Sequence, residues 1–336
     1  MGKPLLAAVA LLTAAVGTAA AVGPQYSQIA AWSAPNAGWD YASVDATARR
    51  LYVGRFGGVL AIDLKSGAIT WPLIKSSLVH GVAPLPGGLA AASNGEANTV
   101  TIFDGNTGRL IFTVPAGAEP DGIIYEPKFG LVTVTDGDGN AISLIDPRKG
   151  VLVAKIKLGG SPEAVAADGR GFLYDNIDDI NEVAVIDVAK RAVVKLIPLP
   201  GCDSPTGMAF DRILGLAVSV CRNGVVNVIR ASDRTVATTL KLAPGPDTAM
   251  IDPGRGVAIV PAGGGGGALE IIALRKNGVA WLQQSVPTEG GTRTGAVDPV
   301  TGKVYLPAAV LTSSPDPRIR HILKPGTFRI LVYAPQ

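Results

Sequence analysis

Sulfur-containing residues, histidine and charge are all scarce in this chain of 336 residues. It holds two cysteines, three methionines and two histidines, and charged residues make up 17% of it. Two cysteines are few for a disulfide-dense scaffold. The formal net charge of +3 is close to neutral for this length, and the basic residues are scattered along the sequence. No nucleic-acid partner is therefore expected, because nonspecific nucleic-acid binding depends on a concentrated positive surface.

Several recurrent motifs are absent as well. The sequence contains neither a Gly-x-Ser-x-Gly nucleophile elbow nor a Cys-x-x-Cys-His site for haem attachment. Its repeating units carry no apolar stripe with helical spacing, so stacked helix pairs are not expected. The same units are rich in Val, Ile, Gly and Pro, a composition typical of short strands and turns.

Long apolar runs are confined to the N-terminus. Leu5–Val16 is apolar, follows Lys3 and precedes the small residues Ala19, Ala20 and Ala21. The run is too short to span a bilayer and is typical of a signal peptide, here residues 1–21, cleaved after Ala21. No cysteine follows it for a lipid anchor, and no later run is suited to cross a membrane. We expect an exported protein, periplasmic or secreted.

A repeat dominates the rest of the chain. Each copy opens on a polar residue, and the gaps between these residues are 40, 41, 42, 43, 41 and 46 positions. Such a period with several short strands per unit is typical of propeller blades, which bury their faces against their neighbours. We predict an all-β fold, a single seven-bladed β-propeller domain over residues 22–336 with four-stranded antiparallel blades. The opening residues are Asp40, His80, Asp121, Glu163, Thr206, Asp247 and Arg293.

The strands of one copy, and the closure of the ring, can be read from the sequence. The third copy predicts strands over Gly122–Tyr125, Leu131–Thr135, Ala141–Ile145 and Val151–Leu158. The seventh copy stops at its third strand, Phe328–Tyr333, and Gln28–Ala34 resembles the missing fourth strand. We therefore expect the N-terminal strand to complete the last blade and remove an exposed edge. An aspartate that ends the third strand should accept N–H groups of the following turn, as at Asp63, Asp104, Asp146 and Asp187.

Short segments resemble a known repeat. Leu51-Tyr52-Val53-Gly54 followed by Val59-Leu60-Ala61-Ile62-Asp63 is similar to the YVTN-type β-propeller repeat, and Ser161-Pro162-Glu163-Ala164 fits the same pattern. The mature chain as a whole resembles the secreted YncE-like proteins. The resemblance implies a seven-bladed propeller but little about activity, because the pattern describes strands and turns. Some YncE-like proteins are described as DNA-binding, which the near-neutral charge of this chain does not support.

The seven opening residues form the candidate site. Each starts an innermost strand, so their side chains should converge at one mouth of the central channel, which is the candidate ligand-binding site. Carboxylates held this close repel one another unless something compensates. Three arrangements would compensate this repulsion: ion pairing with His80 and Arg293, water filling a wide channel, or a bound cation. A divalent cation, Ca²⁺ or Mg²⁺, would be held by Asp121, Glu163 and Asp247.

The two cysteines suggest a disulfide. Cys202 precedes the first strand of the fifth copy, and Cys221 ends its second strand. Loops at these two places emerge on the same face of a blade, so the two thiols should meet and bond in an oxidising compartment. Two buried free thiols are the alternative.

Three functions are compatible with these features of the sequence. The favoured one is a binding or interaction module, monomeric, that takes a small molecule or an envelope protein at the channel mouth. Trp39, beside Asp40, would face the pocket or pack between blades. A metal-dependent, lactonase-like hydrolase is the alternative, with His80 as general base. A partner subunit of a periplasmic redox system is the third.

Overall fold

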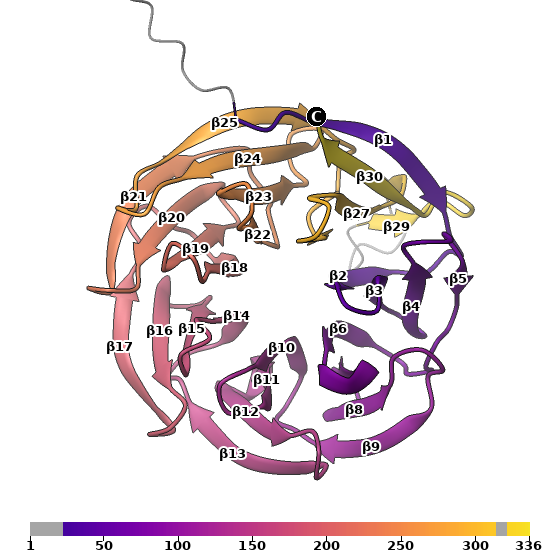
Figure 1. The fold of residues 1–336 in the computed structure, drawn as a ribbon, viewed down its shortest axis with the longest axis horizontal. Helices are drawn as coiled ribbons and strands as arrows, with labels where there is room; N and C mark the ends of the chain where they lie inside the picture. The colour runs from indigo at the N-terminus through magenta and orange to yellow at the C-terminus, as the bar shows by residue number, and fades with distance from the viewer. Residues whose placement is uncertain (1–22, 314–320) are drawn as a thin grey trace, which may run out of the picture.

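The protein is a ring of seven antiparallel four-stranded sheets, here called blades, as predicted (Figure 1). The computed structural model describes residues 23–313 and 321–336, so the predicted signal peptide lies outside the described residues. Within those ranges, no helix has the length and apolar character needed to cross a membrane. Each blade runs outward from the channel, and its strands follow one another in chain order in the first six blades.

The bounds of the first four blades are as follows. Blade 1 comprises β2 (Trp39–Asp45), β3 (Arg50–Arg55), β4 (Gly58–Asp63) and β5 (Ile69–Thr70). Blade 2 comprises β6 (Val79–Pro84), the short 3-10 helix η1 (Pro86–Gly88), β7 (Leu89–Asn94), β8 (Thr99–Asp104) and β9 (Leu110–Pro115). Blade 3 comprises β10 (Pro120–Glu126), β11 (Leu131–Asp136), η2 (Gly137–Gly139), β12 (Ala141–Asp146) and β13 (Val151–Lys157). Blade 4 comprises β14 (Pro162–Ala167), β15 (Phe172–Ile177), β16 (Glu182–Asp187) and β17 (Ala192–Pro198).

The last three blades complete the ring. Blade 5 comprises β18 (Pro205–Asp211), β19 (Leu216–Cys221), β20 (Val225–Arg230) and β21 (Thr235–Lys241). Blade 6 comprises β22 (Met250–Asp252), β23 (Val257–Ala262), β24 (Ala268–Leu274) and β25 (Ala280–Pro287). Blade 7 comprises β26 (Ala296–Val297), β27 (Val304–Ala308), β30 (Arg329–Pro335) and β1 (Tyr26–Ser33). A separate hairpin of β28 (Leu311–Ser313) and β29 (His321–Leu323) lies between β27 and β30 in sequence.

The core is divided into layers between neighbouring blades. Ile142 and Leu144 of blade 3, for example, pack with Leu173 and Ile186 of blade 4, and all four are at most 1% exposed. The two middle strands of a blade are apolar on both faces because each face meets another blade. Outermost strands such as β13 are largely exposed on one side. This arrangement explains why the sequence reads as continuous apolar runs at the middle strands.

The turns after the third strands have the expected aspartate contacts. Asp63 Oδ1 accepts the N–H groups of Lys65 at 2.9 Å and Ser66 at 2.8 Å. Asp104, Asp146 and Asp187 accept backbone N–H groups in the same way. These contacts lower the pKa of each of the four carboxyls, and they confirm a local structural role for these residues.

The N-terminal strand closes the ring, also as predicted. β1 pairs with β30 from Tyr26↔Pro335 to Ser33↔Arg329, and the described start of the chain lies beside the C-terminus (Figure 1). The link from β1 to blade 1 is held by Arg55, which is fully buried. Its guanidinium donates to the carbonyls of Pro35 at 2.7 Å and Ala37 at 2.6 Å. It also lies 3.8 Å from the centre of the Phe328 ring, so it joins blades 1 and 7.

Candidate functional site

The ring residues of blades 1 to 5 lie in a repeated irregularity at the start of the innermost strand. The pairing of that strand with the next shifts register once in each of these blades, so that one extra residue is accommodated, for example between Trp39 and Ala42. Bulges of this kind re-aim side chains and are frequent beside functional sites. Asp247 and Arg293 instead precede the shorter strands β22 and β26.

His80 pairs with the carboxylates on both sides of it. Its Nδ1 lies 2.6 Å from Asp40 Oδ2 and 3.4 Å from Asp121 Oδ1. Burial alone would lower the pKa of His80. The hydrogen bond to Asp40 and the charges of Asp121 and Asp40 outweigh burial and raise this pKa to about 9. His80 is therefore protonated at neutral pH and compensates part of the negative charge of the ring.

Burial favours the neutral form of two further acidic ring residues, Asp121 and Glu163. Burial, followed by the charge of Asp40, raises the pKa of Asp121 to about 8 although His80 opposes the shift. Burial and the charges of Asp121 and Asp247 raise the pKa of Glu163 to about 9. Asp247 pairs with Arg293, whose Nε lies 3.0 Å from Asp247 Oδ2. Of the three predicted kinds of compensation, ion pairing with His80 and Arg293 is therefore present.

Thr206 differs from the other ring residues. Its side chain is fully buried, and its hydroxyl donates to the carbonyl of Pro246 at 2.8 Å. Similar contacts join other neighbouring blades, since Ser93 donates to the carbonyl of Asp121 at 2.6 Å and Thr135 to that of Glu163 at 3.2 Å. Thr206 therefore joins blades 5 and 6 and offers no free hydroxyl to the channel.

Tyr41 is a site residue that the repeat pattern did not identify. It follows Asp40 within the bulge of blade 1 and lines a channel cavity of about 190 Å³ with the apolar residues Val82, Ile123 and Met208. Burial and the nearby charges of Asp121 and Glu163 raise the pKa of its hydroxyl well above the usual value. A comparison of the position that follows the opening residue could have identified Tyr41. In blades 2 to 5 this position holds a small residue: Gly81, Gly122, Ala164 and Gly207. Only blade 1 of these five places a large side chain there.

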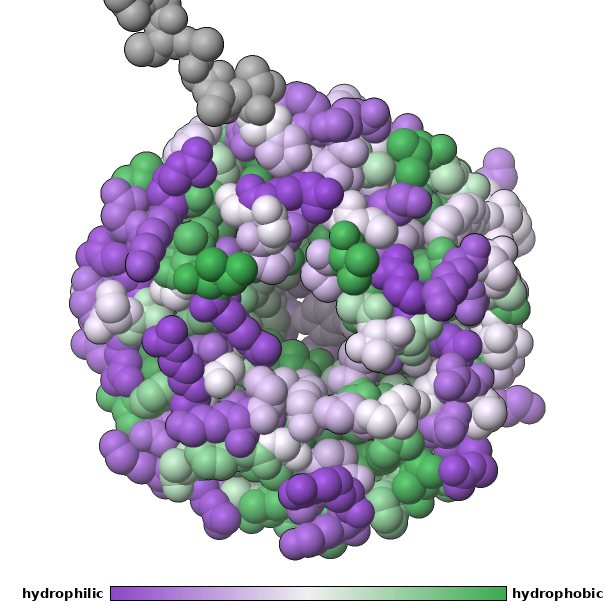
Figure 2. All heavy atoms as spheres, in the orientation of Figure 1, coloured by the Kyte–Doolittle hydropathy of each residue, from purple (hydrophilic) through white to green (hydrophobic). Residues whose placement is uncertain are grey.

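A larger cavity opens beside the ring residues, between blades 6, 7 and 1. This mouth cavity has a volume of about 900 Å³. Its wall combines apolar side chains, a cation, a carboxylate and several glycines; the side chains include Trp39, Phe56, Leu311, Leu323, Arg293 and Glu289. The Arg293 side chain is 57% exposed, so its guanidinium is accessible there. Figure 2 shows the molecule as a closed ring of atoms with an opening at its centre.

The predicted metal ligands are only partly brought together. Asp40, His80 and Asp121 each offer one ligand atom, and these three atoms all lie within 4.8 Å of one another. The predicted set was Asp121, Glu163 and Asp247, so the two sets share Asp121 alone. Two carboxylates and an imidazole suit a divalent cation. The same three groups also form the ion pairs described above.

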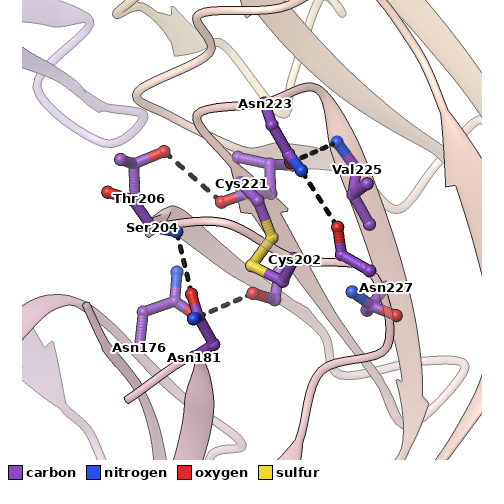
Figure 3. Close-up of a disulfide and its surroundings, with 12 residues drawn as sticks. Asn176, Asn181, Cys202, Ser204, Thr206, Cys221, Asn223, Val225 and Asn227 are labelled. Carbon is purple, nitrogen blue, oxygen red and sulfur yellow. Dashed lines mark hydrogen bonds between the residues drawn. A yellow bond between two sulfur atoms is a disulfide. The ribbon is translucent and has the colours of Figure 1, made fainter. Parts of the chain in front are cut away.

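The predicted disulfide is present. Cys202 and Cys221 are joined, with 5.6 Å between their Cα atoms (Figure 3). The bond ties the loop before β18 to the end of β19, and the neighbouring Ser204 N–H donates to Asn181 Oδ1 at 2.8 Å. This region of the mouth face in blades 4 and 5 is thereby cross-linked.

Comparisons with known proteins support the fold alone. No protein-family model and no curated protein matches the chain. Among solved structures, the chain is similar to a hydrazine synthase of Kuenenia stuttgartiensis, with 19% identity, a TM-score of 0.70, and 81% of this chain and 94% of that one covered. It is also similar to the structure of U3-55K, with 12% identity, a TM-score of 0.76, and coverage of 92% and 99%. Both likenesses support a seven-bladed propeller.

Proposed function

We propose that this chain is an exported binding protein that takes a small molecule in the mouth cavity. The cavity itself carries the proposal. Its volume of about 900 Å³ lies within the range of ligand sites, which are concave, largely apolar and equipped with a few polar groups. Trp39 and Phe56 provide apolar area, while Arg293 and Glu289 provide the polar contacts that would orient a ligand. The YVTN-type repeat pattern is in keeping with a secreted YncE-like propeller.

Glycines shape the cavity and provide a test of it. Gly290 lines the cavity, has an ordinary backbone conformation, and would accept a Cβ with no atom closer than 3.8 Å. Gly290→Leu should therefore fill the cavity without straining the fold. Gly254→Leu is the matched control, because Gly254 also has an ordinary backbone and lies outside the cavity.

The experiment is a thermal-shift screen of a metabolite library against the mature chain, followed by calorimetry on each hit. A ligand should raise the melting temperature of the wild-type chain, bind the Gly254→Leu variant equally well, and lose about tenfold or more in affinity for Gly290→Leu. The absence of any hit, or equal binding to both variants, would contradict a small-molecule site. Capture of an envelope protein that Gly290→Leu abolishes would assign the surface to a protein partner instead.

Export is part of the same proposal. The signal-like segment over residues 1–21 and the Cys202–Cys221 bond support it, because stable disulfides belong to oxidising compartments. Cell fractionation with N-terminal sequencing should find the mature chain outside the cytoplasm and beginning at Val22. Thiol titration of that material should detect no free cysteine. Intact chain with two free thiols in the cytoplasm would contradict export.

A metal-dependent, lactonase-like hydrolase is a second candidate, supported by the grouping of Asp40, His80 and Asp121. These three residues would hold the cation, which would polarise an ester carbonyl or lower the pKa of bound water. His80, predicted as a general base, would then be a ligand. Metal analysis of the purified chain with and without added Ca²⁺, Mg²⁺, Mn²⁺ or Zn²⁺ decides the matter, because no stoichiometric metal would end this candidate.

A further inference from the structure

A third pocket lies on the face opposite the channel mouth. It has a volume of about 400 Å³ and is formed by turns of blades 4, 5 and 6. These turns follow the first or the third strand of a blade, whereas the mouth is built from the loops that precede the first strand or follow the second. Four cationic side chains and one carboxylate line this basic pocket: Arg170, Arg230, Arg234, Lys276 and Asp168.

The cations of the basic pocket are largely uncompensated. Among residues 23–313 and 321–336, no carboxylate lies within salt-bridge distance of Arg170, Arg234 or Lys276, and only Arg230 pairs, with Asp233 at 2.9 Å. Asp168 is buried, and its Oδ1 already accepts the N–H groups of Arg170 at 2.7 Å and Phe172 at 2.9 Å. Gathering like charges around a hollow raises the local attraction for anions.

Arg234 occupies a backbone position that favours glycine. The turn after the third strand ends in a left-handed residue, which is Gly67, Gly108, Gly150 and Gly278 in blades 1, 2, 3 and 6. Blades 4 and 5 instead place Arg191 and Arg234 there, with φ values of 54° and 57°. A bulky side chain in this conformation is strained, and such strain is concentrated at functional sites. Only Arg234 of the two lines the basic pocket.

The Arg234 guanidinium is held in place by an aromatic ring. It lies 4.9 Å from the centre of the Phe172 ring, an arrangement that orders the planar group. It also donates to the hydroxyl of Tyr174, which lines the same pocket. Ile213 and Leu214 add apolar area to the pocket wall, and Ile213 is 70% exposed. The pocket thus combines an ordered arginine, two further free cations and an apolar edge.

We propose that this basic pocket binds a small ligand bearing a diphosphate-like group, recognised by Arg234, Arg170 and Lys276. Planar guanidinium groups match the oxygens of a phosphate, and ammonium groups add a point charge. The fold creates this site from residues of three blades, although the basic residues are scattered along the sequence. The ligand is independent of the one proposed for the mouth cavity, because the two pockets lie on opposite faces.

The experiment is calorimetric titration of the mature chain with pyrophosphate. Arg234→Gly is the informative variant, because glycine suits the left-handed backbone and the turn should still form. It should weaken pyrophosphate binding about tenfold or more, since a charge-assisted hydrogen bond is lost. Arg191→Gly is the matched control, which removes the same charge from the same turn position in blade 4 and should leave the affinity unchanged.

Four further measurements complete the test. Melting curves should show that both glycine variants are folded, and Lys276→Ala, at an exposed position, should weaken binding without touching the core. Inorganic phosphate should bind more weakly than pyrophosphate, and added salt should weaken both. No binding of pyrophosphate at millimolar concentration, or an equal loss in Arg191→Gly and Arg234→Gly, would overturn the proposal.

Discussion

At the scale of single residues, the ring residues couple protonation to stability. His80, Asp121 and Glu163 all have a folded pKa above the ordinary value, at about 9, about 8 and about 9. For each of them, the unfolded chain gives up the proton at a lower pH than the folded chain. The free energy of unfolding contributed by these groups is therefore fully present below the unfolded pKa, and it falls as pH rises toward the folded value.

Glu163→Gln tests this coupling. The amide keeps the shape of the neutral carboxyl, so the free energy of unfolding should match that of the wild-type chain below the unfolded pKa of glutamate, near about pH 3.5. Near about pH 8 the variant should be more stable by about 1–2 kcal/mol, because the unfolded wild-type chain is ionised and the folded one is not. Urea unfolding at both pH values measures the difference. Glu96→Gln, at an exposed loop position on the same face, is the control and should show no such change.

A loss of stability when ring carboxylates are replaced, instead of the gain expected above, would identify a bound cation. If a divalent ion sat among the ring carboxylates, Asp121→Asn combined with Glu163→Gln would lower the melting temperature, and a chelator would lower that of the wild-type chain. With internal pairing alone, the double variant should melt at a higher temperature than the wild-type chain at mildly alkaline pH, and a chelator should have no effect.

The buried environment of Arg55 allows a second prediction about stability at the scale of single residues. Its buried guanidinium satisfies the carbonyls of Pro35 and Ala37 and packs on Phe328, while burial lowers its pKa to about 10. Lysine keeps the charge but cannot reach two carbonyls and an aromatic face together. Arg55→Lys should lower the free energy of unfolding by about 2–4 kcal/mol, whereas Arg148→Lys at an exposed turn should change it by less than about 0.5 kcal/mol. Equal stability of the two variants would contradict a clamping role.

At the scale of elements, the spacing of the repeat predicted the blades but not how their side chains meet. The period depends on strand and turn lengths, which the sequence displays directly, and so Asp40, His80, Asp121 and Glu163 were located correctly at the start of innermost strands. The pairing of His80 with both neighbouring carboxylates depends on rotamers and on the bulge, which spacing does not encode. Tyr41 was missed because a strand pattern of period two assigns it to the opposite face from Asp40.

The contact between blades 1 and 2 gives an element-scale prediction. At the position where blades 2 and 3 use Ser93 and Thr135 to bind the next carbonyl, blade 1 has Gly54, where a Cβ would lie 2.1 Å from the carbonyl oxygen of His80. Gly54→Ala should push β3 of blade 1 away from β6 of blade 2 and lower the free energy of unfolding by about 2 kcal/mol or more. Gly254→Ala, which has room for a methyl group, should change it by less than about 1 kcal/mol. Chemical denaturation of both variants provides the comparison.

At the scale of the whole molecule, the ring gives the protein two unlike faces. The mouth carries four of the predicted acidic residues, and the opposite face carries the basic pocket. The sequence indicated the first because the acidic residues recur at one position of the repeat. It did not indicate the second, because Arg170, Arg234 and Lys276 occupy different turn positions in different blades and meet only once the ring has formed.

Ring closure by β1 is the feature on which both faces depend. β1 pairs along the length of β30, and the backbone of Tyr26 exchanges hydrogen bonds with the side chain of Gln284 at 2.7 and 3.0 Å. Deleting residues 1–34 should leave β30 as an exposed edge and remove a layer of the core beside Tyr305, which Trp32 contacts at 5.5 Å between ring centres. Because blades are stable only through their neighbours, we expect the truncated chain to melt far below the full one and to aggregate. Size-exclusion chromatography and calorimetry measure both effects, with a chain lacking residues 1–22 as the control. A truncated chain that stays monomeric and melts with the control would show that the ring does not need its N-terminal strand.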